Sequence, residues 1–203
     1  MILYLHGFRS SPLSTKAQML KQELVKHGLG NAWQCPQLPA GPQQAIDLCN
    51  NLIESKGKAS PDTTEPLVIV GSSLGGFYAQ YLAQKWACHA VLLNPVIDAA
   101  RDLANHTGQQ THYHSNAPFH FHSHYLQELA ALKIGPPTYP ERFFLMATTG
   151  DEVLNWKEMA AWYAGCQSRI ISGSDHGIHD FARWMPEVTS FILGSYPSHQ
   201  KAD

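Results

Sequence analysis

The chain has 203 residues, of which 44% are hydrophobic and 15% charged, which is an ordinary balance for one globular domain with a buried core. Its 14 Lys and Arg against 16 Asp and Glu give a formal net charge of −2, so we expect neither nucleic acid nor a membrane surface as a partner. No signal peptide or membrane-spanning run is recognisable and the four cysteines are scattered, so we expect a cytoplasmic protein with reduced thiols.

Short apolar runs alternate with helical patterns in the first part of the chain. The run Ile2–Leu5, closed by His6-Gly7, predicts a first strand. A helix is expected from Ser14, as its N-cap, to about His27. Its apolar face consists of Ala17, Leu20, Leu24 and Val25. A shorter strand at 32–36 and a helix beginning at Pro42 follow, and then a polar surface loop at 55–66.

The later elements repeat this alternation. Strands are expected at 67–70, 90–93, 142–147 and 169–171, and helices at 77–83, 155–164 and 181–193, the last interrupted at Pro186. Between about 97 and 140 the pattern loosens and shows one helical piece, His124–Leu132. We expect this segment to be a lid-like insertion in a single domain.

Strands that are apolar throughout and alternate with helices predict an α/β protein with a mostly parallel sheet covered by helices on both faces. In such sheets, chemistry collects at the carboxyl ends of the strands. His6, Ser73, Asp151 and His176 each follow a predicted strand, so the fold would bring them to one edge.

The pattern Gly71-Ser72-Ser73-Leu74-Gly75 stands between a predicted strand and a predicted helix. A sharp strand-to-helix turn centred on a serine is typical of a nucleophile elbow, which holds the hydroxyl above the sheet. Glycines on both sides of the serine suit the close backbone approach that such a turn requires. Ser73 is therefore the candidate nucleophile.

A serine hydroxyl needs a base to accept its proton and a carboxylate to orient that base. In the α/β-hydrolase arrangement these residues follow one another as Ser, acid and His. Asp151 and His176 occupy this order after Ser73, and both lie in short loops after strands. The donors to a developing oxyanion would be the backbone N–H groups of Leu74, at a helix N-terminus, and of Phe8, in the loop after the first strand.

Over nearly its whole length the sequence resembles the YqiA-type esterase family, which consists of small bacterial α/β-hydrolases. The matching motifs are Tyr4-Leu5-His6-Gly7-Phe8-Arg9-Ser10-Ser11-Pro12, Pro36-Gln37-Leu38-Pro39, Ile69-Val70-Gly71-Ser72-Ser73-Leu74-Gly75-Gly76-Phe77-Tyr78, Asn94-Pro95 and Thr149-Gly150-Asp151-Glu152-Val153-Leu154. The resemblance implies esterase or thioesterase activity on acyl substrates, with Ser73, Asp151 and His176 at the triad positions. The chain departs from the family at Gly173-Ser174-Asp175-His176, where Gly-Gly-Asn-His is more usual, and in its histidine-rich middle segment.

Several neighbouring residues compete for the same roles. His179 is the alternative base, Asp175 and Glu152 are the alternative acids, and Ser72 lies beside the nucleophile. His6 is expected to support the loop that carries Phe8.

Histidines alternate in His112-Tyr113-His114 and in His120-Phe121-His122-Ser123-His124, a spacing that could bind Zn²⁺ or Ni²⁺. No cysteine or fixed carboxylate completes such a site, so we expect no metal and no cofactor. A lid would instead offer apolar surface to an acyl chain. The residues expected to supply it are Phe119, Phe121, Tyr125 and Leu126.

The sequence therefore predicts a serine esterase or thioesterase that acts on small-molecule acyl esters. A non-catalytic binding protein on the same fold is one alternative from another class, and a protein that binds metal through the histidine-rich segment is the other. No feature of the sequence indicates an oligomeric state.

Overall fold

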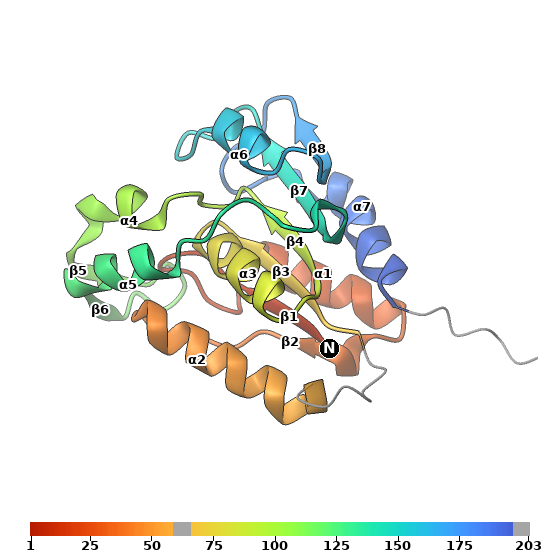
Figure 1. Cartoon of the computed structure of the whole chain (residues 1–203), viewed down its shortest axis with the longest axis horizontal. Coiled ribbons are helices and arrows are strands. Elements are labelled where there is room, and N and C mark those ends of the chain that lie inside the picture. Colours follow the sequence, from red (N-terminus) through yellow and green to blue (C-terminus); the bar gives the residue numbers. More distant parts are fainter. Residues whose placement is uncertain (59–65, 197–203) are drawn as a thin grey trace, which may run out of the picture.

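In the computed structural model, which describes residues 1–58 and 66–196, a parallel sheet of six strands forms the centre of the molecule (Figure 1). The strands are β1 (Ile2–Leu5), β2 (Trp33–Gln34), β3 (Val68–Ser72), β4 (His89–Leu93), β7 (Phe143–Thr148) and β8 (Gln167–Ile171). Their order is β2-β1-β3-β4-β7-β8, and every neighbouring pair runs parallel. This confirms the predicted α/β class.

Helices cover both faces of the sheet (Figure 1). On one face lie α1 (Thr15–Lys26) and α7 (Phe181–Gly194), and on the other lie α2 (Pro42–Ile53), α3 (Leu74–Lys85) and α6 (Trp156–Trp162). Alternate strand residues therefore enter different cores: Val68 and Val70 of β3 pack toward α1 and α7, and Ile69 packs toward α2 and α3. Burial on both faces is why the central strands are apolar without alternation.

The segment between β4 and β7 is more regular than the sequence indicated. The predicted helix is confirmed as α5 (His124–Leu132). The segment also contains the short helix α4 (Ala99–Asp102) and an antiparallel hairpin of β5 (Gly108–Thr111) and β6 (Pro118–Phe121). The sequence did not reveal the hairpin because β5 is polar on both faces and has no apolar alternation.

Two helix predictions were wrong in detail. Val25 is exposed, because it lies one position past Leu24 and therefore about 100° around α1 from the buried face. The helix α7 continues through Pro186 without interruption. The proline lies on the exposed side of the helix, where water can hydrogen-bond to the carbonyl that loses its N–H partner.

Shorter elements complete the described chain. They are a π-helical turn (Glu54–Lys58) and 3₁₀ turns at Gly30–Ala32, Ala104–His106 and Pro140–Arg142. The loop predicted at 55–66 thus begins with the π-helical turn, and its residues 59–65 lie outside the described residues. Not one of the described helices combines the length and the apolar character needed to cross a bilayer.

Candidate active site

Ser73 lies at the junction of β3 and α3 with φ 56° and ψ −121°, a strained backbone for a residue with a side chain. The turn depends on two glycines. A Cβ at Gly71 would collide with the backbone of Gly75, and a Cβ at Gly75 would collide with the carbonyl of Leu5 at the end of β1. The predicted strand-to-helix turn is therefore present, and it places Ser73 above the carboxyl end of the sheet.

The three side chains expected to form a triad meet in one chain of hydrogen bonds. His176 Nε2 lies 3.0 Å from Ser73 Oγ, and His176 Nδ1 lies 2.8 Å from Asp151 Oδ2. The other carboxylate oxygen of Asp151 accepts the N–H groups of Val153 and Leu154, at 2.8 and 2.7 Å. The Asp151 side chain is completely buried and that of His176 is 21% exposed. Asp151 is thus held from both sides and cannot turn away from the imidazole.

The competing residues do not bond the imidazole of His176 or the hydroxyl of Ser73. The His179 side chain is 68% exposed and contacts Asp175, which is itself 50% exposed. Glu152 accepts the backbone N–H of His176 at 3.0 Å, so it supports the loop rather than the ring. The imidazole of His176 is bonded to Ser73 and not to Ser72, which belongs to β3.

Asn94, which sequence reasoning noted only as part of a motif, anchors the loop that carries His176. This residue follows β4, is completely buried, and has φ 42°. Its Nδ2 donates to the carbonyl oxygens of His176 and Asp175 and to Thr148 Oγ1, at 3.0, 3.3 and 3.0 Å. Its Oδ1 accepts the Thr148 N–H at 2.9 Å. One side chain therefore joins the ends of β4 and β7 to the His176 loop.

We predict that Asn94→Ala lowers the free energy of unfolding by about 3 kcal/mol, because it leaves several buried polar groups without partners. Ester hydrolysis should fall on the order of 10²-fold through displacement of His176. Asn116 is a matched control, since it also has positive φ (54°) but is exposed. Urea denaturation should show a loss of only about 1 kcal/mol for Asn116→Ala. Equal losses in the two variants would show that the Asn94 side-chain bonds contribute nothing.

His6 holds the loop after β1 rather than approaching Ser73. Its Nδ1 lies 3.0 Å from the Gly7 carbonyl oxygen, and its Nε2 accepts the Leu38 N–H at 3.1 Å. This pair of bonds requires a neutral ring with the proton on Nδ1. Burial lowers the pKa of His6 to about 4, against the opposing hydrogen bond to Gly7.

This burial predicts a pH-dependent stability. The unfolded chain binds the His6 proton near pH 6.5 and the folded protein only near pH 4, so the stabilisation is complete above pH 6.5 and is lost as the pH falls to 4. Between pH 7 and 4 the wild type should lose about 3 kcal/mol more unfolding free energy than His6→Gln, whose amide oxygen can still accept the Leu38 N–H. Denaturant titrations at a series of pH values measure this difference. Parallel pH profiles would contradict it.

The loop after β1, which His6 holds in place, lies directly against the nucleophile elbow at Ser73. A Cβ placed on Gly7 would be 3.2 Å from Ser73 Cβ and 3.7 Å from Ser73 Oγ. Within the described residues, the backbone N–H groups of Phe8 and Leu74 make no hydrogen bond with protein acceptors. Leu74 is also the first residue of α3, where the helix dipole favours negative charge. Both N–H groups expected to stabilise an oxyanion are therefore free to do so.

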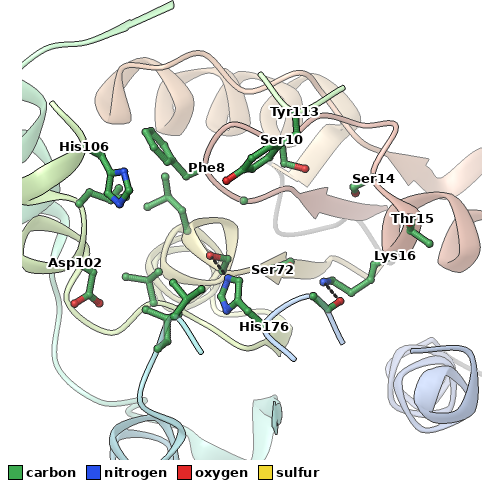
Figure 2. A pocket seen from close by; sticks show the side chains of 18 of the residues that line it. Phe8, Ser10, Ser14, Thr15, Lys16, Ser72, Asp102, His106, Tyr113 and His176 are labelled. Atoms are coloured by element: carbon green, nitrogen blue, oxygen red, sulfur yellow. Dashed lines mark hydrogen bonds between the residues drawn. The ribbon is translucent and has the colours of Figure 1, made fainter. Parts of the chain in front are cut away.

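A cavity of about 490 Å³ opens at Ser73 and His176 (Figure 2). Much of its lining had no signal in the sequence, because it comes from loops and helix starts that only the fold brings together. Apolar lining comes from Phe8, Leu74, Val96, Leu103, Val153 and Leu154. Polar lining includes Ser10, Thr15, Lys16, Asp102, His106, Tyr113 and His114.

The four residues expected to contact an acyl chain do not line this cavity. Phe121 is buried and packs edge-on against Phe8, as does Phe119, with ring centroids 5.1 and 5.9 Å apart. Tyr125 packs on Phe121, and Leu126 packs partly buried against the same core. Phe119 and Phe121 therefore support Phe8 directly, and Tyr125 supports Phe121.

Several histidine rings of the insertion pack against one another or against an aromatic ring. The rings of His120 and His122 lie 4.5 Å apart, those of His122 and His124 lie 5.3 Å apart, and His112 lies 4.5 Å from Phe119. In the part of the chain that the structure describes, no three His, Cys, Asp or Glu side chains are grouped so that they could hold a metal ion.

The sheet order, the elbow and the covering helices define an α/β-hydrolase fold, as the similarity to solved structures also shows. The chain belongs to the uncharacterised protein family UPF0227, whose model matches residues 1–193. This is the family of small bacterial YqiA-type esterases, so the resemblance drawn from the sequence motifs is confirmed.

Three solved structures illustrate the similarity. A putative hydrolase from Agrobacterium vitis S4 has a TM-score of 0.67 at 17% identity and covers 94% of this chain and 87% of its own. Est1E from Butyrivibrio proteoclasticus with ferulic acid bound has a TM-score of 0.67 at 14% identity, covering 96% and 88%. The esterase Pf2001 from Pyrococcus furiosus has a TM-score of 0.63 at 14% identity, covering 97% and 83%. At such identities the likeness establishes the fold alone.

Proposed function

We propose that the protein is a serine esterase that hydrolyses small-molecule acyl esters or thioesters through an acyl-enzyme. The observation that carries this proposal is the hydrogen-bonded chain Asp151–His176–Ser73, which ends on a strained elbow at the mouth of a cavity. Membership of a family of small esterases supports the same reaction class.

Proton transfer follows from the hydrogen bonds. The Asp151 carboxylate can only accept, so the proton of the neutral imidazole resides on Nδ1 and leaves Nε2 free to accept from the Ser73 hydroxyl. As Ser73 Oγ attacks the carbonyl carbon, His176 takes its proton, and buried Asp151 stabilises the imidazolium. His176 then returns the proton to the departing alcohol or thiol.

The negative charge that develops on the carbonyl oxygen is bound by the N–H groups of Phe8 and Leu74. These groups belong to the two loops that meet at Ser73, and the N-terminus of α3 adds a favourable dipole. Preorganised donors of this kind are typically worth about 3–4 kcal/mol of transition-state stabilisation each.

A water activated by His176 then attacks the acyl-enzyme and releases the acid, so the reaction needs no cofactor. The apolar part of the cavity lining suits an acyl group, and its volume of about 490 Å³ suits a small molecule. Residues 97–140 act as a lid, since Leu103, His106, Tyr113 and His114 bring this segment to the cavity.

Labelling with a fluorophosphonate tests the proposal directly. We expect stoichiometric phosphonylation at Ser73, found by mass spectrometry of the digested protein, because the reagent requires an activated serine. Ser72→Ala should label like the wild type and Ser73→Ala should not label at all. Absence of an adduct on correctly folded wild type would favour a non-catalytic binding protein.

A further inference from the structure

Lys16 brings a positive charge into the cavity that contains Ser73. It is partly buried, and its Nζ donates a 2.5 Å hydrogen bond to the carbonyl oxygen of Gly177, the residue after His176. Figure 2 shows its side chain directed from the start of α1 toward the His176 loop, on the side of His176 away from Asp102 and His106. The ammonium is thus a neighbour of the proposed base.

No carboxylate among residues 1–58 and 66–196 forms an ion pair with this ammonium. Burial lowers the pKa of Lys16 to about 8, against the opposing effect of Asp175 and Asp151, so the side chain remains mostly protonated at pH 7. Asp151 is already bonded to His176, and Asp175 to the His179 backbone. The Lys16 ammonium is partly withdrawn from water and has no contacting anion, so an anionic group of a ligand in the cavity would gain a charge-assisted contact there.

The position of Lys16 in its helix gives an independent indication. It is the second residue of the twelve-residue helix α1, whose first turn contains no acidic side chain. A helix N-terminus carries partial positive charge and favours anions, so a lysine there opposes the helix dipole. The Lys16 side chain and the N-terminus of α1 together place positive charge on one side of the cavity. Ser10, Thr15 and Tyr113 add hydroxyl groups to the lining of the same cavity.

We propose that Lys16 forms an anion subsite in this cavity, and that the ester or thioester substrate carries a carboxylate or phosphate group that binds there. The inference rests on the proposed function for the reaction at Ser73. The apolar part of the lining, which includes Val96, Leu103 and Val153, takes the uncharged part of the same molecule.

A pair of esters of equal length tests the subsite. The 4-nitrophenyl monoester of glutaric acid ends in a carboxylate where 4-nitrophenyl pentanoate ends in a methyl group. We expect Lys16→Met to lower the ratio of kcat/KM for the charged ester over the neutral ester by about 10- to 100-fold, the worth of one charge-assisted hydrogen bond. Lys21→Met is the matched control, since Lys21 is exposed on the same helix, and it should leave the ratio unchanged. An unchanged ratio in Lys16→Met would overturn the proposal, even if both rates fell through loss of the bond to Gly177.

Binding to the Ser73→Ala variant separates the subsite from the reaction. This variant should bind the intact charged ester about 10-fold more tightly than the neutral one, and addition of Lys16→Met should abolish the difference. Equal affinities in Ser73→Ala would overturn the anion subsite, whereas failure of the wild type to hydrolyse either ester would overturn the proposed function. Competitive inhibition of pentanoate hydrolysis identifies the group bound: stronger inhibition by inorganic phosphate indicates a phosphate, and stronger inhibition by acetate a carboxylate.

Discussion

Ser73→Ala should reduce kcat for a simple aryl ester by about 10⁶-fold, the size of effect expected when the nucleophile of a serine hydrolase is removed. The reason is that the remaining groups have no oxygen to acylate: His176 loses its hydrogen-bond partner at Nε2, and Asp151 orients a base with no proton to accept. The residual rate should come only from substrate binding and the N–H groups of Phe8 and Leu74. Steady-state hydrolysis of 4-nitrophenyl butyrate measures the loss.

Ser72→Ala is the control for this prediction, because Ser72 is the adjacent serine on β3 and does not bond His176. It should retain activity within about 10-fold of the wild type, since only substrate positioning changes. The unfolding free energy of Ser73→Ala should stay within about 1 kcal/mol of the wild type, because the backbone turn is imposed by Gly71 and Gly75. Turnover by Ser73→Ala near the wild-type rate would exclude the proposed nucleophile.

The sequence predicted the elements of the sheet because burial on both faces leaves a strong local signal. The runs that became β1, β3, β4 and β7 are each short, apolar and bounded by glycine or polar residues. The rule that parallel strands direct their carboxyl ends to one edge then brought Ser73, Asp151 and His176 together without any knowledge of distances. The local sequence pattern and the topology of a parallel sheet were therefore sufficient to predict that these three residues meet.

The contacts that Asn94 and Lys16 make with the His176 loop could not be predicted from the sequence. Asn94 reaches the His176 loop from 82 residues away in the chain, and Lys16 reaches Gly177 from 161 residues away. Neither contact has a local pattern, because each depends on how loops after different strands pack over the sheet edge. An asparagine after a strand has no distinctive sequence signal, and the position of a lysine in a first helical turn does not show which distant loop its side chain contacts.

The insertion at residues 97–140 shows a second kind of feature that the sequence does not predict, namely which way its apolar side chains face. Its aromatic residues are apolar and lie in an expected lid, so the sequence predicts that they contact substrate, yet Phe119 and Phe121 pack on Phe8. The sequence identifies apolar side chains but does not say whether they face a cavity or a neighbouring loop. Here their contribution is indirect: they hold in place the loop whose Phe8 N–H is proposed to bind the oxyanion.

Asp151→Asn should lower kcat by about 10⁴-fold although it changes only one atom of the carboxylate. The Val153 and Leu154 N–H groups both donate to Oδ1, so an asparagine must present its oxygen to them. Its NH₂ group then faces His176 Nδ1 and can only donate. The imidazole must therefore carry its proton on Nε2, opposite Ser73 Oγ, where it can no longer accept the serine proton.

Asp175→Asn provides the matched control, since Asp175 is adjacent to His176 in the sequence and half-exposed. An asparagine there can still accept the His179 N–H, so kcat should stay within about 10-fold of the wild type. Fluorophosphonate labelling of Asp151→Asn should slow in parallel with kcat, because both reactions require Nε2 to accept a proton. If Asp175→Asn lost activity and Asp151→Asn kept it, the acid would have to be reassigned. Equal, modest losses in both would mean that the imidazole is oriented by the loop bonds of Asn94 and Glu152 and not by a carboxylate.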